Sequence, residues 1–354
     1  MPLRVRPVVT LAVLAAIAGC ETPAARLEVA RWEAALGRPA TTDWKREQRL
    51  EESFMTPDFS ARLYRQRTGP RTEQLVLLMI PHGLRGMAPG VVVPFYDPDR
   101  MCGYDLRSKT PLGPERNSAK FGLHLVRQGY VVAAAESYPY NVLTEQEVAK
   151  APSGFGVWRL AADKLARTDP DLTGMGKLTH DARRAMDLLA EAPEADPSRL
   201  AYMGHSLGGK TSFYAGALDL RARAVVASDF GIGWDSTNWQ DAWYFGGRLK
   251  GMRAAGLEHG DLLACMAPRG FFLIAGQYDG EQSRPQLDRA REAYVAAGAD
   301  AEALRMFDHK SGHQPSFESL RAAYRWLALR LGRPEPDLAF LSELERQQAS
   351  APKR

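Results

Sequence analysis

A short glycine-rich turn carries the residue best suited to covalent chemistry. The chain reads Gly204-His205-Ser206-Leu207-Gly208, a G-x-S-x-G pattern between an apolar run and a stretch of small residues. Such a strand-to-helix turn strains the serine and exposes its hydroxyl, and a side chain at either glycine would collide with the turn. The Leu207 N–H would begin a helix, where unpaired donors and the helix dipole favour an oxyanion. The pattern predicts a nucleophile at Ser206, and its alternative is a purely structural turn.

A serine nucleophile needs a base and an acid, and residues later in the chain have suitable positions. Asp279 and His313 each follow a predicted strand. The order serine, aspartate, histidine is the one expected for an α/β-hydrolase. Asp229, which follows the strand after Ser206, is the alternative acid, and His309 is the alternative base. We expect Ser206, Asp279 and His313 to be the catalytic residues.

Apolar runs that alternate with helical patterns must position these side chains. The predicted strands are 59–67, 74–80, 129–135, 200–203, 222–228, 270–276 and 303–307. The predicted helices are 121–128, 144–150, 155–167, 178–191, 209–218, 284–297 and 317–331. This alternation indicates an α/β fold with a mostly parallel central sheet, flanked by helices on both faces and carrying loop or lid insertions. Catalytic groups gather at the carboxyl ends of such strands.

The loop after the predicted strand 74–80 is the expected source of the second oxyanion donor. It reads Pro81-His82-Gly83-Leu84. In lipases and esterases, a backbone N–H from a loop after an early central strand completes the oxyanion hole. Leu84 is the first choice and Gly83 the second. His82 could be a base, but shaping this loop beside the substrate is the favoured role.

An aromatic stretch follows the strand 222–228. Six aromatic residues lie within sixteen positions, and Trp234, Trp239 and Trp243 are the largest of them. Interleaved with polar residues, they suit the rim of a substrate pocket that stacks on an apolar or sugar-like face. A small satellite core under a long loop is an equally good interpretation.

The sequence favours no metal site and requires no cofactor. The acidic residues of the loop-rich stretch 91–120 lie among Pro, Gly and Arg, which favours solvated turns over a calcium site. His309 and His313 are four residues apart, but Gly312 and Pro315 disfavour the helix that a metal pair would need. Serine chemistry of this kind needs no cofactor.

The amino terminus has the pattern of an export signal. Arg4 and Arg6 precede the apolar stretch 8–18, which is too short to span a bilayer permanently. Small residues lead into Cys20, and this junction resembles the bacterial lipobox, which implies lipidation of that cysteine. By the same resemblance, Glu21 in place of aspartate after Cys20 implies the outer membrane. An ordinary signal peptide with an incidental cysteine is the alternative.

Composition supports one large core. The 354 residues are 45% hydrophobic and 25% charged, with a formal net charge of +4 and no long basic run, so a nucleic-acid partner has no support. Cys102 and Cys265 could pair, but the sequence does not decide whether they do.

The expected segments are a signal peptide (1–19), a tether with N-terminal helices (20–55), a catalytic domain (56–332) and a C-terminal tail (333–354).

Four motifs carry a resemblance to a known superfamily. They are PHG at 81–83, GHSLGG at 204–209, APRGFFLIAGQYDG at 267–280 and SGH at 311–313. Over about three quarters of its length the chain resembles the α/β-hydrolase superfamily, in particular its dienelactone-hydrolase-like and acetyl-xylan-esterase-like bacterial members.

Together with the amino-terminal export signal, the resemblance implies an exported serine esterase. It would cleave a small acyl or carbohydrate ester through an acyl-enzyme on Ser206, and a lipid on Cys20 would hold it on the membrane, facing the periplasm. One alternative is a peptidase of the prolyl-oligopeptidase type, although the roughly 50 residues before the first strand leave no room for its propeller domain. Another is a non-catalytic envelope binding protein with the same fold.

Overall fold

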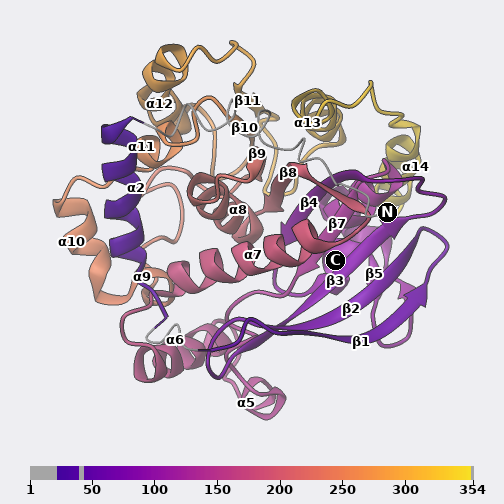
Figure 1. Ribbon diagram of the computed structural model, residues 1–354, viewed down its shortest axis with the longest axis horizontal. Helices are drawn as coiled ribbons and strands as arrows, with labels where there is room; N and C mark the ends of the chain where they lie inside the picture. Colours follow the sequence, from indigo (N-terminus) through magenta and orange to yellow (C-terminus); the bar gives the residue numbers. More distant parts are fainter. Residues whose placement is uncertain (1–21, 40–43, 352–354) are drawn as a thin grey trace, which may run out of the picture.

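The computed structural model describes residues 22–39 and 44–351 (Figure 1). The predicted signal peptide and the predicted lipidation site at Cys20 lie outside the described residues. No helix among the described residues is long and apolar enough to cross a membrane. Cys102 and Cys265 are both buried thiols and are not joined to each other.

One sheet of nine strands organises the molecule, in the order β1-β2-β3-β7-β4-β8-β9-β10-β11. These strands are β1 (Gln48–Met55), β2 (Phe59–Arg67), β3 (Glu73–Pro81), β7 (Val131–Ala135), β4 (Ala88–Pro94), β8 (Ala195–His205), β9 (Ala222–Ser228), β10 (Gly270–Ala275) and β11 (Leu304–Asp308). From β7 to β11 every neighbouring pair is parallel, whereas β1, β2 and β3 pair antiparallel with one another and β3 is antiparallel to β7. The mostly parallel α/β-hydrolase sheet is confirmed.

Two strands depart from the sequence prediction. β4 falls at the start of a stretch read as loop, because its Pro and Gly residues resemble turn signals, yet all seven of its residues are buried. The early apolar run, now β3, is the predicted strand 74–80, but within the mostly parallel sheet it runs antiparallel to β7. A small hairpin of β5 (Tyr104–Asp105) and β6 (Thr110–Pro111) lies outside the main sheet.

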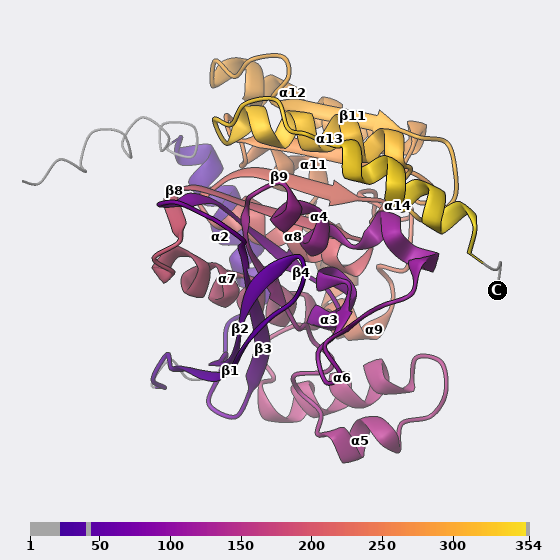
Figure 2. The same cartoon turned by 90° about the vertical axis from the view of Figure 1, so that its right-hand side faces the viewer.

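Alternate residues of the central strands enter opposite cores, as period-2 geometry requires. In β8, Ala201 and Met203 pack on the side of helices α4 (Phe121–Arg127), α13 (Phe317–Arg330) and α14 (Ala339–Ala349). Leu200 and Tyr202 face the side of α7 (Gly174–Glu191) and α8 (Leu207–Leu218). Figures 1 and 2 show these two helical layers with the sheet between them.

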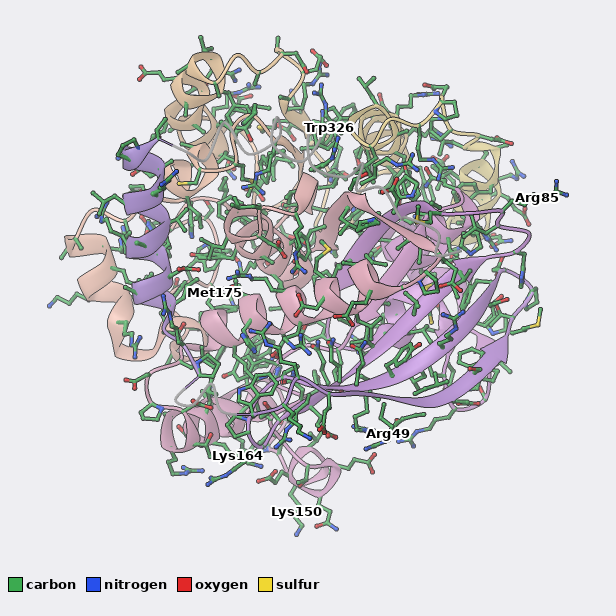
Figure 3. All side chains as sticks on the ribbon, viewed as in Figure 1. Arg49, Arg85, Lys150, Lys164, Met175 and Trp326 are labelled. Atoms are coloured by element: carbon green, nitrogen blue, oxygen red, sulfur yellow. The ribbon has the colours of Figure 1, made fainter. Side chains whose placement is uncertain are left out.

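The remaining helices surround this framework. They are α2 (Pro23–Leu36), α3 (Pro98–Cys102), α5 (Glu145–Ala149), α6 (Gly156–Thr168), α9 (Ala242–Phe245), α10 (Leu249–Ala254), α11 (His259–Ala264) and α12 (Arg284–Ala296), with 3₁₀ turns η2 (Pro114–Ala119), η3 (Gly246–Arg248) and η4 (Glu281–Ser283). Figure 3 shows Arg49, Arg85 and Lys150 at the periphery of the molecule, whereas Met175 lies within it and is fully buried.

Both terminal segments pack on the domain. In α2, inside the segment expected as a tether, Trp32 is fully buried against Tyr214 and Trp234. In α14, inside the segment expected as a tail, Leu341 and Leu344 enter the core beside α13 and α4. The compact fold therefore reaches further toward each end than the limits 56–332 drawn from the sequence.

Candidate active site

Ser206 stands at the junction of β8 and α8 with the backbone of a strained elbow. Its φ is 55° and its ψ is −113°, a region that non-glycine residues rarely occupy. A Cβ on Gly204 would lie 2.1 Å from the Gly208 carbonyl oxygen, and a Cβ on Gly208 would lie 2.2 Å from the Pro94 carbonyl oxygen. The Ser206 N–H donates to the Ser228 carbonyl at 2.8 Å, which fixes the turn. Both glycines are needed for close backbone approach, as the pattern predicted.

His313 connects this serine to a buried carboxylate. Its Nε2 lies 2.9 Å from the Ser206 Oγ, and its Nδ1 lies 2.6 Å from the Asp229 Oδ2. A carboxylate accepts from Nδ1–H, so Nε2 is left to accept the serine proton. His313 lies in the loop between β11 and α13 with its side chain 33% exposed, whereas Asp229 is fully buried. The structure thus joins a serine, a histidine and an aspartate in one hydrogen-bonded chain.

The acid in this chain is Asp229, and the expectation that Asp279 would fill this position is wrong. The Asp279 carboxylate accepts the N–H groups of Phe230, Gly231 and Ile232, each at 2.8 Å, and the Ser283 hydroxyl at 2.7 Å. These four hydrogen bonds satisfy the Asp279 carboxylate with partners other than His313. Burial raises the pKa of Asp279, and its hydrogen bonds to Ile232 and Ser283 oppose that rise.

The two aspartates hold each other's loops. Asp229 Oδ1 accepts the N–H groups of Tyr278 and Asp279 at 2.7 and 3.0 Å, and Oδ2 accepts that of Gln277 at 3.1 Å. Asp279 in turn accepts three N–H groups from the loop after Asp229. Because both loops leave adjacent parallel strands at the same edge, this reciprocal bonding fixes the carboxylate that meets His313. Both residues follow buried strands in the sequence, which is why the pattern alone left them as rivals.

The loop proposed for the second oxyanion donor lies at the wrong edge of the sheet. Since β3 runs antiparallel to β7, its carboxyl end lies opposite the carboxyl ends of the parallel strands, where Ser206 stands. The Leu84 N–H donates to the Pro81 carbonyl at 3.3 Å within the β3–β4 turn. His82 contacts the Thr56 carbonyl at 2.9 Å through its Nε2. The expectations for Leu84 and its alternative Gly83 as oxyanion donors, and for His82 as a substrate contact, are therefore wrong.

The loop that does reach Ser206 follows β4, the strand next to β8. Its backbone touches the nucleophile elbow, as the close approach of Pro94 to Gly208 shows. The Phe95 N–H is already donated to the Ala135 carbonyl at 3.1 Å. The next N–H, that of Tyr96, finds no acceptor within 22–39 and 44–351, and neither does the Leu207 N–H at the first position of α8. These two amides are the candidates for an oxyanion hole.

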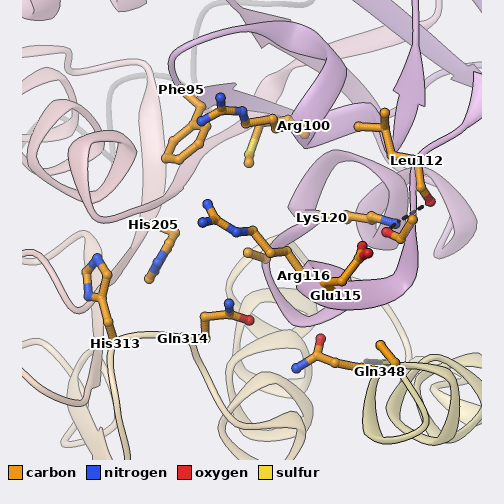
Figure 4. Close-up of a pocket in the computed structure, with 14 residues that line it drawn as sticks. Phe95, Arg100, Leu112, Glu115, Arg116, Lys120, His205, His313, Gln314 and Gln348 are labelled. Atoms are coloured by element: carbon orange, nitrogen blue, oxygen red, sulfur yellow. Dashed lines mark hydrogen bonds between the residues drawn. The ribbon is translucent and has the colours of Figure 1, made fainter. Parts of the chain in front are cut away.

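A cavity of about 1040 Å³ opens beside His313 (Figure 4). Its lining comes from the β4–α3 segment, the η2 region, the nucleophile elbow, the loop before α13 and the end of α14. The lining residues are Phe95, Arg100, Met101, Leu112, Gly113, Glu115, Arg116, Ala119, Lys120, His205, His313, Gln314, Gln348 and Ala351. Sequence reasoning missed most of them because the stretch 91–120 has no regular periodicity.

The tryptophans expected at the pocket rim are core residues instead. Trp234, Trp239 and Trp243 are 5%, 0% and 6% exposed. The Trp234 Nε1–H donates to the Leu257 carbonyl at 2.8 Å, and the Trp239 Nε1–H donates to the Gly231 carbonyl at 2.6 Å. The substrate-binding assignment of these residues is wrong. They are core residues, as the alternative interpretation expected, but they belong to the large core on one side of the sheet and not to a small satellite.

His205 is a site residue that the sequence named only as the variable position of the turn. Its Nδ1 lies 3.1 Å from the Ser228 Oγ, and its ring centroid lies 4.6 Å from that of His313. Burial, with His313 as the next contribution, lowers the pKa of His205 to about 3. The ring is therefore neutral at physiological pH and presents a polar but uncharged edge to the cavity.

The alternative base, His309, takes no part in this chain of hydrogen bonds. Its Nδ1 lies 2.5 Å from the Ser311 Oγ.

Across the described parts of the chain, no group of three or more His, Cys, Asp or Glu residues is arranged to hold a metal ion.

Comparison with known proteins connects the fold to solved esterases. No family model matches the chain. Over 67 residues it is 40% identical to the polyketide transferase ATR5 of Stachybotrys chlorohalonatus, a match that spans 19% of this chain and only 22% of that relative.

Solved structures match over most of the chain. A glucuronoyl esterase from Solibacter usitatus has a TM-score of 0.62 at 16% identity, covering 86% of this chain and 91% of its own. A glucuronoyl esterase from Teredinibacter turnerae has a TM-score of 0.59 at 17% identity, over 91% and 83% of the two chains. Acetyl xylan esterase 1 from Thermoanaerobacterium has a TM-score of 0.50 at 15% identity, over 86% and 93%. The chain therefore has the α/β-hydrolase fold, in the form that it shares with these carbohydrate esterases.

Proposed function

We propose that the protein is a serine hydrolase that cleaves a carboxylic ester, with a small acyl or carbohydrate ester as its substrate. The observation that carries this proposal is the continuous chain of hydrogen bonds from Ser206 through His313 to Asp229. In a structural turn or a binding protein, nothing requires a strained serine to meet an imidazole that is itself held by a buried carboxylate.

The mechanism follows from the position of each group. His313 Nε2 takes the proton of Ser206, whose Oγ attacks the acyl carbon. The same imidazole gives that proton to the departing alcohol, and water then adds to the acyl-enzyme to release the acid. Asp229 keeps the imidazole in the useful tautomer and stabilises its positive charge.

The oxyanion would be held by backbone amides. In this proposal, the N–H groups of Leu207 and Tyr96 are directed at the oxygen that becomes negative. Each is held on a fixed element, α8 or the loop after β4, so little reorganisation is needed during the reaction. Loss of one such donor costs about 10²–10³ in rate in comparable acyl-transfer sites.

The solved neighbours favour a carbohydrate ester over other classes. They include glucuronoyl esterases, an acetyl xylan esterase and a methylesterase. The large cavity beside His313 is consistent with an alcohol portion the size of a sugar, since ligand pockets commonly span about 300–1,000 Å³.

Hydrolysis of an ester panel tests the proposal directly. The full chain is assayed with p-nitrophenyl acetate through decanoate and with acetylated sugars, beside Ser206→Ala. The control is Ser198→Ala, an exposed serine near the opposite end of β8. We expect hydrolysis that is lost in Ser206→Ala and retained in the control. If neither the wild type nor Ser206→Ala hydrolysed any ester of the panel, the esterase proposal would be rejected and peptides would be the next substrates to test.

The cellular location is a second part of the proposal. We propose that the protein is exported and anchored through a lipid on Cys20, facing the periplasm at the outer membrane. Expressed in a Gram-negative bacterium, the wild type should take up radiolabelled palmitate and sediment with outer membranes, whereas Cys20→Ala should do neither. Unlabelled wild-type protein would contradict the anchor without affecting the esterase proposal.

A further inference from the structure

The cavity beside His313 is rich in positive charge. Arg100, Arg116 and Lys120 line it, against one carboxylate, that of Glu115. A protein surface that needs only to bind a neutral sugar has no reason to gather three cations around one cavity, because their mutual repulsion is unfavourable.

The three cations differ in the number of hydrogen-bond or ion-pair partners that they have within the protein. The Lys120 Nζ donates to the carbonyls of Leu112 and Gly113 and to the Asn117 Oδ1, at 3.1, 2.8 and 2.8 Å. The Arg100 Nε lies 3.2 Å from the Asp97 carboxylate. Lys120 and Arg100 therefore already have partners within the protein.

Arg116 has no such partner. Among the described residues, no hydrogen bond or ion pair engages its guanidinium, and the side chain is exposed. Figure 4 shows the guanidinium directed into the cavity, toward His205 and the catalytic end. Five donors in a planar fork are thus available to an incoming group, in the geometry that matches a carboxylate.

The wall that carries Arg116 is tied to the rest of the domain. Asn117 Nδ2 donates to the Leu344 carbonyl at 3.2 Å, and the Ser118 N–H donates to the Gln348 Oε1 at 2.8 Å. Ser118 Oγ also donates to Gln314 Oε1 at 3.3 Å, next to His313. Because these bonds join η2 to α14 and to the catalytic loop, the position of Arg116 relative to the imidazole is defined by the fold.

We propose that the substrate carries a carboxylate on its alcohol portion and that Arg116 binds it, with Arg100 contributing positive charge. This inference rests on the proposed esterase function. The assignment to the alcohol portion follows from His313, which lines the same cavity and must give its Nε2 proton to the leaving oxygen. Such a substrate would be an ester of an acidic sugar or another hydroxy acid.

Paired substrates place the charge on one half of the ester at a time. 4-Acetoxybenzoate carries a carboxylate on the leaving group, and 4-acetoxybenzamide is its neutral counterpart. The 4-nitrophenyl monoester of glutaric acid carries the carboxylate on the acyl half, and 4-nitrophenyl valerate is neutral. Values of kcat/KM for all four are compared in wild type, Arg116→Gln, Arg116→Lys and Arg107→Gln, the last an exposed arginine outside the cavity lining.

The expected result is a preference of the wild type for 4-acetoxybenzoate over its amide. In Arg116→Gln this preference should fall by about tenfold to a hundredfold, the worth of a charge-assisted hydrogen bond. Arg116→Lys should restore part of it, and Arg107→Gln should leave it unchanged. Hydrolysis of both neutral esters by Arg107→Gln should stay within about twofold of wild type, since surface substitutions away from the site have small effects. For the Arg116 variants, the informative quantity is the ratio of kcat/KM for 4-acetoxybenzoate to that for 4-acetoxybenzamide.

The outcomes separate this inference from the function on which it rests. Hydrolysis of the neutral esters with no preference for 4-acetoxybenzoate would overturn the carboxylate site and leave the esterase intact. A preference confined to the glutarate monoester would also overturn it, by placing the charge on the acyl half. No hydrolysis of any ester would reject the proposed function itself.

Discussion

Asp229 and Asp279 show how two residues of one type take different parts in one site. Both are fully buried and both accept three backbone N–H groups. Only Asp229 has an oxygen that also meets His313, at 2.6 Å. The fourth partner of Asp279 is the Ser283 hydroxyl. We therefore infer that Asp229 positions the imidazole and that Asp279 holds the loop that carries Asp229.

Asp229→Asn should abolish most of the activity, and it should also lower the free energy of unfolding by about 1–3 kcal/mol, because its Nδ2 would face a backbone N–H such as that of Gln277. The amide keeps the size of the side chain but favours the wrong histidine tautomer, so we expect kcat to fall by about 10⁴-fold, as for other triads. The measurement is kcat on p-nitrophenyl acetate, with the thermal midpoint recorded beside it. Retention of more than a tenth of the activity would show that Asp229 is not the acid.

Asp279→Asn should act on stability first. Its Nδ2 would face the N–H of Phe230, Gly231 or Ile232, and a buried donor left without an acceptor costs about 1–3 kcal/mol. We expect the free energy of unfolding to fall by that amount or more in urea denaturation. The folded variant should keep a larger kcat than Asp229→Asn, and the reverse order would restore Asp279 as the acid.

At the scale of elements, strand direction decides which loops meet Ser206. β3 and β4 are neighbours in sequence, yet β3 ends at the edge remote from the nucleophile and β4 ends beside it. The PHG motif at 81–83 therefore lies away from the site, and the Phe95–Tyr96 segment takes its expected place. Three other residues expected at the site, all tryptophans, are buried in one hydrophobic core instead.

Trp239→Ala tests that assignment. Trp239 is fully buried, packs on Tyr214 and lies 4.0 Å below the Lys210 ammonium. Truncation should lower the free energy of unfolding by about 3–5 kcal/mol, with KM for esters unchanged in the folded protein. Leu329→Ala, at an exposed residue, serves as the control and should change stability by less than about 0.5 kcal/mol. A raised KM at unchanged stability would return Trp239 to the substrate pocket.

At the scale of the whole molecule, one partly buried acid should make stability depend on pH. Glu136 follows β7 and accepts the Leu75 N–H at 3.1 Å. Burial raises the pKa of Glu136 from 4.5 to about 7, although Leu75 and Arg65 oppose the shift. The folded protein then keeps a proton that the unfolded chain releases, so its contribution to stability is present below pH 4.5 and is lost as the pH rises to 7.

Glu136→Gln should remove this dependence. The amide oxygen can still accept the Leu75 N–H, and no charge has to be buried at high pH. We expect the variant to exceed wild type in free energy of unfolding at pH 8 by up to about 3 kcal/mol, and to match it at pH 4. Urea titrations at both pH values measure this, with the exposed Glu145→Gln as control. Equal stability of Glu136→Gln and wild type at pH 8 would contradict the expectation.

The sequence by itself determined the parts of this protein that depend on local geometry. The elbow at Ser206 needs glycine at positions 204 and 208, because backbone carbonyls lie where larger side chains would be. This requirement concerns only the five consecutive residues 204–208, so it is visible in the sequence as the G-x-S-x-G pattern. His313, on the loop before the last long helix, and the mostly parallel sheet were likewise predictable from apolar runs and chain order.

Only the tertiary structure decided which groups the sheet brings together. Asp229 and Asp279 both end buried strands, and their roles were separated by strand order, which places β9 next to β8 and β10 one strand further away. The oxyanion loop and the cationic cavity were equally hidden, since the direction of β3 and the docking of α14 on η2 are contacts between distant parts of the chain. Such contacts leave no periodic pattern in the residues that make them.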